Sequence, residues 1–207
     1  IRNDTREPMN PPTAIGPHVM VNGERFVPYI TRNRIQTRVA ELASDLNRSF
    51  DGKRPIFICV LNGAFMFFAD LVRHITIECE VDFLRLSSYG DKKISSGNVK
   101  LLKDLACDAK GRNIVLVEDI VDTGISLDFM KKLIAAKNPA SLTIVTMLHK
   151  PERTQIAHEL GYIGFVVPPQ FVIGYGLDYA QQARNLPEVY ILDDTRAAES
   201  AREKECE

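Results

Sequence analysis

The segment 113–126 constrains the fold most strongly, because it joins a buried strand, an acidic stretch, a loop and the start of a helix. It opens with the apolar run 114–117, Ile-Val-Leu-Val, which is typical of a strand buried on both faces of a parallel sheet. Two carboxylates, Glu118 and Asp119, follow this run, and an amphipathic helical pattern begins at Leu127. Ligands bind at such strand ends in open α/β sheets, so we expect the functional site here.

Strand-like apolar runs alternate with amphipathic helical patterns along most of the chain. This alternation predicts an α/β fold with a parallel sheet and right-handed crossovers. The predicted strands are 55–61, 81–87, 114–117, 142–148, 163–167 and 189–192, and the predicted helices are 31–50, 65–74 and 127–138. We also expect a hairpin-like piece at 18–30, a polar loop at 88–98, a short helix from Pro151 and a strand or turn at 171–176.

A chain of 207 residues fits a single domain, here with a surface arm at 1–17 and a charged tail at 194–207. The formal net charge of −1 gives no global basic field that would attract nucleic acid or an anionic membrane. No apolar run approaches the ~20 residues that cross a bilayer. We therefore expect neither a nucleic-acid partner nor a membrane partner.

Four cysteines, Cys59, Cys79, Cys107 and Cys206, show no CxxC or other metal-binding spacing. The four histidines form no HExxH pattern, so a structural zinc site is not favoured. Cys59 lies in an apolar run and reads as a small core residue. Cysteines without a disulfide or metal-binding pattern are typical of proteins in a reducing compartment, and we expect a cytoplasmic protein.

The loop 122–126, Asp-Thr-Gly-Ile-Ser, has the chemistry of a phosphate site. It offers a flexible glycine, two hydroxyls and the backbone amides of a helix start, where the helix dipole favours an anion. The ATP-binding pattern GxxxxGK[ST] is absent from the sequence, which removes the main support for ordinary ATP hydrolysis.

The acid pair before the loop has a different task, because carboxylates repel phosphate. Two adjacent acids at a strand end can accept hydrogen bonds from the two hydroxyls of a ribose. In the plainer interpretation, Glu118 and Asp119 are ordinary solvated residues and Asp122 is a helix cap. Three acids and Thr-Gly-Ile-Ser directly after an apolar strand favour a ribose 5-phosphate site instead.

The run 115–126, Val-Leu-Val-Glu-Asp-Ile-Val-Asp-Thr-Gly-Ile-Ser, closely resembles the phosphoribosyl-diphosphate signature of type I phosphoribosyltransferases. The resemblance is closest to the hypoxanthine-guanine branch and extends over about residues 50–193. Further matches in the same order are 59–71, 87–90, 148–151 and 169–179. The resemblance implies the type I fold, a central mainly parallel sheet flanked by helices, with a small hood from the N- and C-terminal segments.

On the sugar side, the resemblance implies that Glu118 and Asp119 hold the ribose hydroxyls. It implies Asp122 as the catalytic general base near purine N7, a role typically worth ~10²–10⁴-fold in rate. The implied 5-phosphate site comprises Asp122, Thr123, Gly124, Ile125 and Ser126.

On the base side, the resemblance implies that Lys150 donates to the purine 6-oxo group and that Phe171 stacks on the ring. The Val172 carbonyl and Asp178 would face the 2-position. Magnesium is the implied cofactor, near Asp178 through water and with Glu118 and Asp119 as further contacts. Each residue also has a plain interpretation: a surface lysine, a core phenylalanine and a helix-capping aspartate.

The diphosphate is expected at the backbone amides of Asn62 and Gly63, in a loop with a non-proline cis peptide, and at Arg184. Ser88 and Tyr89 would close as a lid over the reaction. Two positions depart from the family pattern, because Asn62 and Gln170 stand where many relatives carry lysine. Asn62 therefore brings no charge to the diphosphate, and Arg184 alone also reads as a solvated helix face.

The resemblance implies a role in purine salvage. The 5-phosphoribosyl group would pass from phosphoribosyl diphosphate to N9 of hypoxanthine or guanine, giving IMP or GMP plus diphosphate, in a homodimer or homotetramer. The alternative from another class is a regulator on this fold that binds nucleotide and RNA. It would need a basic face, against which the net charge of −1 argues. Xanthine or a pyrimidine is the alternative acceptor, although Lys150 and Phe171 favour a 6-oxopurine.

Overall fold

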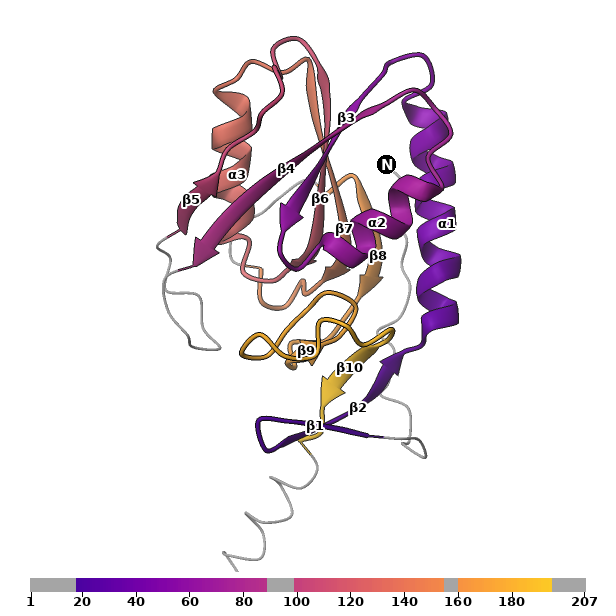
Figure 1. Ribbon diagram of the computed structural model, residues 1–207, viewed down its shortest axis with the longest axis vertical. Helices are drawn as coiled ribbons and strands as arrows, with labels where there is room; N and C mark the ends of the chain where they lie inside the picture. Colours follow the sequence, from indigo (N-terminus) through magenta and orange to yellow (C-terminus); the bar gives the residue numbers. More distant parts are fainter. Residues whose placement is uncertain (1–17, 89–98, 155–159, 195–207) are drawn as a thin grey trace, which may run out of the picture.

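The computed structural model describes residues 18–88, 99–154 and 160–194. They form a six-stranded sheet of order β5-β4-β3-β6-β7-β8 and a four-stranded sheet of order β1-β2-β10-β9 (Figure 1). The elements are β1 (Val19–Val21), β2 (Glu24–Ile30), α1 (Arg32–Ser49), β3 (Ile56–Leu61), α2 (Phe65–Arg73), β4 (Glu80–Ser88), β5 (Val99–Lys103), β6 (Asn113–Val121), α3 (Ile125–Ala135), β7 (Ser141–His149), β8 (Tyr162–Val166), β9 (Val172–Ile173) and β10 (Val189–Leu192).

The large sheet confirms the predicted parallel architecture. Strands β4, β3, β6, β7 and β8 pair in parallel, and only β5 runs antiparallel, at the edge beside β4. The sequence did not predict β5. Lys100 and Lys103 flank its apolar pair, and edge strands with charged residues leave a weak pattern.

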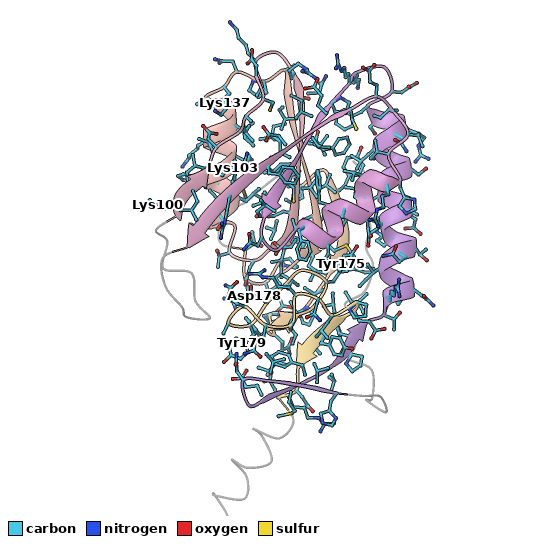
Figure 2. The ribbon with its side chains drawn as sticks, viewed as in Figure 1. Lys100, Lys103, Lys137, Tyr175, Asp178 and Tyr179 are labelled. Atoms are coloured by element: carbon cyan, nitrogen blue, oxygen red, sulfur yellow. The ribbon has the colours of Figure 1, made fainter. Side chains whose placement is uncertain are left out.

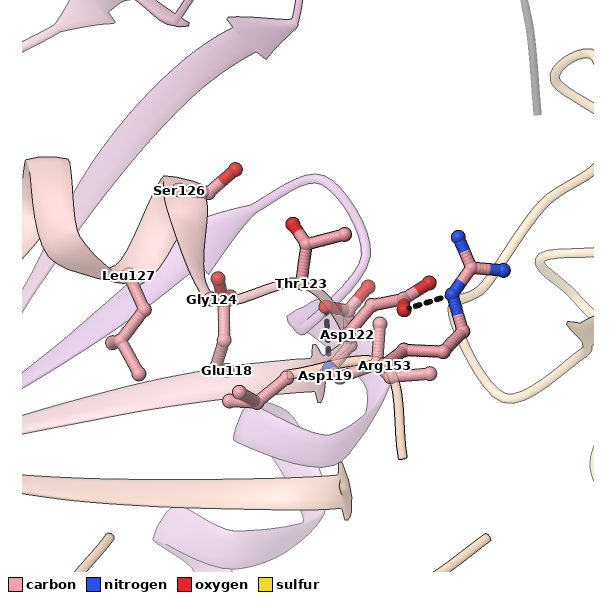
Figure 3. A pocket seen from close by; sticks show the side chains of 10 residues that line it. Glu118, Asp119, Asp122, Thr123, Gly124, Ser126, Leu127 and Arg153 are labelled. Atoms are coloured by element: carbon pink, nitrogen blue, oxygen red, sulfur yellow. Dashed lines mark hydrogen bonds and ion pairs between the residues drawn. The ribbon is translucent and has the colours of Figure 1, made fainter. Parts of the chain in front are cut away.

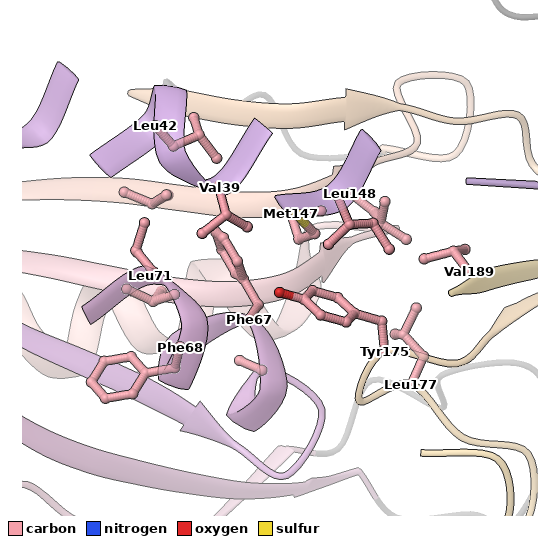
Figure 4. Close-up of a cluster of buried hydrophobic side chains, with 14 of the residues drawn as sticks. Val39, Leu42, Phe67, Phe68, Leu71, Met147, Leu148, Tyr175, Leu177 and Val189 are labelled. Atoms are coloured by element: carbon pink, nitrogen blue, oxygen red, sulfur yellow. The ribbon is translucent and has the colours of Figure 1, made fainter. Parts of the chain in front are cut away.

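The helices cover both faces of the large sheet, as the β-strand alternation of side chains requires. Phe57 and Cys59 point to the side of α1 and α2, whereas Ile56 and Ile58 pack with α3 residues such as Met130. The core on the α1–α2 side also receives Tyr175 from the segment after β9 (Figure 4). Cys59 is fully buried, which confirms it as a small core residue.

The four-stranded sheet is the predicted hood. Two of its strands, β1 and β2, come from the N-terminal part of the chain, and β9 and β10 come from the C-terminal part. All three pairings are antiparallel. Figure 1 shows this small sheet beyond the carboxyl ends of β3, β6 and β7, the edge at which we expected a ligand site.

Two predictions were wrong, the end of one strand and the presence of one short helix. β6 does not end at Val117 but continues through Val121, because its parallel pairing with β7 extends as far as Val121 and His149. The acid pair is therefore part of the strand. The helix expected from Pro151 is a turn over residues 151–153, closed by a hydrogen bond from the Arg153 amide to the Lys150 carbonyl, 3.1 Å.

Within the described ranges, no helix is long and apolar enough to cross a membrane. Cys59, Cys79 and Cys107 carry free thiols, while Cys206 lies outside the described residues. The predicted arm at 1–17, most of the tail at 194–207 and most of the 88–98 loop also lie outside them.

Candidate active site

The large sheet opens between β3 and β6 at their carboxyl ends. The pairing of these strands stops at Cys59 and Val117, whereas β6 stays paired with β7 for four more residues. The chain leaves β3 through a cis peptide between Leu61 and Asn62, which confirms the predicted non-proline cis bond. Glu118 and Asp119 follow Val117, and so lie beside the opening.

The loop after β6 presents a helix start to the same opening. Gly124 has φ 85°, a left-handed conformation that glycine adopts without steric cost, and α3 begins at the next residue. The first helical hydrogen bond runs from the Asp128 amide to the Gly124 carbonyl, 2.9 Å. The amides of Ser126 and Leu127 lie in the first turn, where the amides of any helix lack a carbonyl partner within the helix. Figure 3 shows the hydroxyls of Thr123 and Ser126 directed to the same side of the loop.

Two adjoining cavities occupy this opening. The first measures about 240 Å³ and is lined by Glu118, Asp119, Ile120, Val121, Asp122, Thr123, Gly124, Ser126, Leu127 and Arg153. The second measures about 210 Å³ and is lined by Val60, Leu61, Gly63, Leu86, Glu118, Asp119 and Ser126. The acid pair and Ser126 line both cavities. The predicted ribose residues, most of the predicted phosphate residues and Gly63 therefore line two adjoining cavities, whereas Ile125, Asn62 and Arg184 line neither.

Both acids of the pair resist ionisation in this setting. Burial raises the pKa of Glu118 well above its usual range, and the neighbouring charge of Asp119 raises it further. Burial likewise raises the pKa of Asp119 to about 6, although a hydrogen bond from the Ile120 amide and the charge of Arg184 oppose the shift. A ligand that donates hydrogen bonds, or brings positive charge, would relieve this cost.

Glycine at position 63 lets the β3 loop approach the acid pair. A Cβ atom on Gly63 would lie 1.4 Å from Asp119 Oδ2, so no larger residue fits without displacing that carboxylate. On its other side, a Cβ atom on Gly176 would lie 2.0 Å from the Gly63 carbonyl oxygen. The loop after β3 is thus packed between the acid pair and the segment after β9.

Two cations flank the carboxylate of Asp122. Arg153 Nε lies 2.7 Å from Asp122 Oδ1, and Lys150 Nζ lies 3.7 Å from Oδ2 (Figure 3 shows the Arg153 contact). Lys150 is only 3% exposed, and burial lowers its pKa against the opposing charge of Asp122. The Thr154 hydroxyl lies 2.9 Å from the carbonyl oxygens of both Asp122 and Lys150, which ties the two loops together.

Arg153 was not among the predicted site residues. Its position, three residues after Lys150 in the run Lys-Pro-Glu-Arg, was the available signal. The expected helix obscured it, because a helix would have directed this side chain differently from the turn that forms.

None of the predicted purine residues is in the lining of these two cavities, although Lys150 contacts the lining residue Asp122. The Phe171 ring packs edge-on against Tyr179, with centroids 5.4 Å apart, and against Phe26 at 6.3 Å. Val172 is buried in β9. Figure 2 shows Asp178 and Tyr179 on the loops between the large sheet and the hood.

Arg184 fixes this segment and connects it with the acid pair. Its guanidinium pairs with Asp178 Oδ1 at 2.7 Å and donates to the Gly176 carbonyl at 2.8 Å. Its positive charge also lowers the pKa of Asp119, against the larger effect of burial. The Arg184 side chain is therefore held by Asp178 and Gly176, and it does not lie on a solvated helix face.

The remaining predicted residues differ in what the structure records of them. The Asn62 side chain is exposed, as expected if only its amide serves a ligand. Ser88 is the last residue of β4, so the predicted loop starts after it. Tyr89 lies outside the described residues.

A magnesium ion would find an incomplete protein shell here. Among the residues that the structure describes, no three His, Cys, Asp or Glu side chains are grouped for a metal. Magnesium at phosphate-transfer sites usually keeps waters and takes one or two carboxylates plus substrate phosphates. The buried Glu118 and the partly buried Asp119 fit this second arrangement, because a cation would favour the charged forms that burial opposes.

Known proteins resemble this chain over most of its length. Residues 30–180 match the family described as phosphoribosyl transferase domain. The hypoxanthine-guanine phosphoribosyltransferase of Bacillus subtilis is 42% identical over 163 residues, covering 79% of this chain and 91% of that protein. A crystal structure of the Bacillus anthracis hypoxanthine-guanine phosphoribosyltransferase superposes with a TM-score of 0.76, at 40% identity, covering 80% of this chain and 98% of that one.

Some relatives are much longer. The bifunctional protein TilS/HprT of Listeria innocua is 42% identical over 163 residues, which is 79% of this chain but 25% of that protein. This chain thus spans about a quarter of that relative and nearly all of the Bacillus enzyme. The matched family, the identity and the shared fold agree with the site geometry, and the chain belongs to the phosphoribosyltransferase family, in its hypoxanthine-guanine branch.

Proposed function

We propose that this chain transfers the 5-phosphoribosyl group of phosphoribosyl diphosphate to N9 of hypoxanthine or guanine. The observation that carries the proposal is the shared lining of the two cavities. A helix-start phosphate loop, the acid pair of Glu118 and Asp119, and the Gly63 loop all face one opening of the sheet. The three groups suit the 5-phosphate, the ribose hydroxyls and the diphosphate of a single substrate.

The sugar phosphate is held from two sides in this proposal. The amides and hydroxyls of residues 123–126 bind the 5-phosphate at the positive end of the α3 dipole. Glu118 and Asp119 accept hydrogen bonds from the ribose hydroxyls. Without substrate, burial makes the charged forms of these two acids unfavourable. Hydrogen bonds from the ribose hydroxyls would stabilise those charged forms, so part of the binding energy arises at the reacting sugar.

Asp122 acts as the general base. The N9–C1 bond forms as the C1–oxygen bond to diphosphate breaks, and the proton on purine N7 passes to the Asp122 carboxylate. Arg153 and Lys150 hold that carboxylate at the mouth of the phosphate loop. Lys150 also donates to the 6-oxo group, so the residue that recognises the base touches the residue that deprotonates it.

The purine lies against Phe171, with the Val172 carbonyl and Asp178 facing its 2-position. Phe26 of β2 and Tyr179 of the segment after β9 pack against the Phe171 ring and limit its rotation. A 2-amino group can donate to a backbone carbonyl, which favours guanine, whereas hypoxanthine needs only Lys150 and the stacking platform. Both bases therefore fit the proposal.

The diphosphate binds to the amides of Asn62 and Gly63 and near Arg184. Magnesium, held by Glu118, Asp119 and water-linked Asp178, would neutralise the charge that develops on the leaving diphosphate. Water has to be kept from the sugar, because it would hydrolyse the substrate. We assign this exclusion to a lid that includes Ser88 and Tyr89.

We further propose a homodimer or homotetramer in the cytoplasm. An exposed apolar group at the β4–β5 edge supports self-association, with Val81 52%, Phe83 38% and Leu102 50% exposed. A crystal structure concerned with the oligomeric state and activity of the Trypanosoma cruzi hypoxanthine phosphoribosyl transferase is 34% identical, with a TM-score of 0.75.

A base panel tests the function. The chain is incubated with phosphoribosyl diphosphate, Mg²⁺ and one base at a time, namely hypoxanthine, guanine, xanthine, adenine or uracil, and nucleotide is quantified. Nucleotide from hypoxanthine and guanine supports the proposal. The absence of nucleotide with every base, together with salt-dependent binding of RNA, would replace it with the regulator.

A further inference from the structure

Tyr175 links the purine segment to the helix that follows the diphosphate loop. Its hydroxyl donates to Asp70 Oδ2 in α2, at 2.8 Å, although the two residues are 105 positions apart. The ring is 4% exposed and packs in the core beside Phe67 (Figure 4). Its backbone has φ 50°, between two glycines that also have positive φ. This conformation directs the side chain away from the hood and into the α2 layer.

Asp70 is a fixed acceptor. Gln36 of α1 donates to the same Oδ2 atom at 2.7 Å, and Arg73 lies 3.6 Å from Oδ1. Burial and the Asp70 charge both raise the pKa of Tyr175, so its hydroxyl keeps its proton and remains a donor. A hydrogen bond to an ionised acceptor is roughly twice as strong as a neutral one.

The diphosphate loop and α2 form one unit. The Phe65 amide donates to the Asn62 carbonyl at 3.2 Å, and the Phe68 amide donates to the Ala64 carbonyl at 2.8 Å. The loop therefore passes into the first turn of the helix without a break. Gly63 and Asp70 therefore belong to one hydrogen-bonded segment.

The purine segment forms a second unit. Gly174 and Leu177 exchange two backbone hydrogen bonds of 3.1 Å, and Arg184 binds both Gly176 and Asp178. Two contacts between the units matter here. Gly176 rests on the Gly63 carbonyl, and Tyr175 binds Asp70. One contact is at the mouth of the site, and the other is inside the core.

We propose that Tyr175 and Asp70 are positioning residues that couple the diphosphate site to the purine site, so that diphosphate bound at residues 62–63 strengthens purine binding. The inference rests on the proposed function. A ligand that orders one unit lowers the ordering cost of the other, because the two share a fixed contact. By linkage, the purine strengthens diphosphate binding by the same factor.

Calorimetry with an unreactive pair measures this coupling. Hypoxanthine is titrated into the chain with and without saturating magnesium diphosphate, which contains no ribose and so permits no transfer. The ratio of the two dissociation constants is the coupling factor. Coupling between sites typically amounts to about 5–150-fold, and we expect at least tenfold for the unchanged chain.

Two matched variants separate positioning from stability. Tyr175→Phe removes the hydroxyl and keeps the buried ring. Tyr162→Phe removes another tyrosine hydroxyl bond between two elements, the exposed one from β8 to Ser49 Oγ of α1 at 2.7 Å, which has a neutral acceptor and lies away from the site. We expect Tyr175→Phe to reduce the coupling factor to threefold or less and Tyr162→Phe to leave it unchanged. Thermal unfolding of both confirms that they fold.

Asp70→Asn provides a second variant, because its amide oxygen still accepts from Tyr175 without a charge. We expect an intermediate coupling factor. The inference is overturned if Tyr175→Phe couples as strongly as the unchanged chain, if Tyr162→Phe loses equally much, or if the unchanged chain shows no coupling. In each case nucleotide formation by the unchanged chain shows that the proposed function stands, whereas its absence shows that the function itself fails.

Discussion

Arg153 Nε lies 2.7 Å from Asp122 Oδ1, so a residue of the turn after β7 holds the side chain that precedes the α3 helix. The two residues follow the neighbouring strands β6 and β7, whose carboxyl ends lie at the same edge of the sheet. Thr154 reinforces the link through the Asp122 carbonyl. The carboxylate assigned to proton removal is therefore positioned by the loop that also carries Lys150.

Replacing Arg153 by leucine should lower kcat about tenfold, which corresponds to about 1.4 kcal/mol of transition-state stabilisation. The reason is that Asp122 loses the ion pair that orients it. Steady-state kinetics with hypoxanthine and phosphoribosyl diphosphate measures the effect. In an Asp122→Asn background the same change should have little further effect, because the two residues act as one unit.

Arg112→Leu is the matched control for Arg153→Leu. Arg112 pairs with Glu80 at 2.8 Å, beside the amino ends of β4 and β6, far from the proposed chemistry. It should leave kcat within twofold. Equal losses in the two leucine variants would show that Arg153 matters only for stability.

Phe171→Ala should weaken purine binding by about 5–150-fold, because stacking of a base on an aromatic ring contributes about 1–3 kcal/mol. The effect belongs in the KM for hypoxanthine, with a smaller change for phosphoribosyl diphosphate. Phe83→Ala removes a half-exposed ring on β4 and should change neither KM. Unchanged purine affinity in Phe171→Ala would refute the stacking assignment.

Gly63→Ala should reduce kcat/KM at least a hundredfold, because the new Cβ would displace the Asp119 carboxylate from 1.4 Å. The displaced acid can no longer serve the ribose. Gly52→Ala is the comparison, since no atom lies within 4 Å of its added Cβ. It should lose only about 1 kcal/mol of stability from its left-handed backbone and retain activity. Full activity in Gly63→Ala would contradict the packing described here.

Asp119→Asn should stabilise the substrate-free fold at pH 7 while weakening phosphoribosyl diphosphate binding. The pKa of Asp119 is raised from 3.8 to about 6, so the folded state binds more protons than the unfolded state between these values. The free energy of unfolding therefore falls as pH rises from about 4 to 6, by roughly 2–3 kcal/mol. Urea unfolding should show the gain of the variant at pH 7 and its disappearance near pH 4.

Asp82 serves as a control of opposite sign. Burial opposes its charge, but hydrogen bonds from the Cys107 and Phe83 amides outweigh burial and lower its pKa to about 2. Its contribution is present above about pH 4 and is lost as pH falls towards 2. Asp82→Asn should therefore destabilise the fold at pH 7. Equal signs for the two variants would contradict the assignment of the Asp119 shift to unrelieved burial.

The sequence predicted those parts of the site that are continuous along the chain. An apolar run, two acids and Thr-Gly-Ile-Ser locate a strand, an acid pair that lines the cavities and a helix start, because each depends on neighbouring residues. The hood was also predictable, because the chain resembles a family whose fold includes one. The edge strand β5 was not, because it has one neighbour and two lysines that interrupt its apolar pattern.

Contacts between distant positions could not be predicted in the same way. Arg153 reaches Asp122 only because Pro151 opens a turn and not a helix. Tyr175 reaches Asp70 through a left-handed backbone between two glycines, and the sequence Gly-Tyr-Gly does not say where the ring points. Both contacts depend on the packing of strands and helices that only the fold brings together.

The decisive measurement is nucleotide formation by the unchanged chain compared with Asp122→Asn. With phosphoribosyl diphosphate, Mg²⁺ and hypoxanthine, we expect IMP and diphosphate in equal amounts, formed at least ~10²-fold faster than by the variant. Hypoxanthine affinity should remain similar in the two proteins. Release of diphosphate without IMP, or equal turnover by the two proteins, would contradict phosphoribosyl transfer with Asp122 as its base.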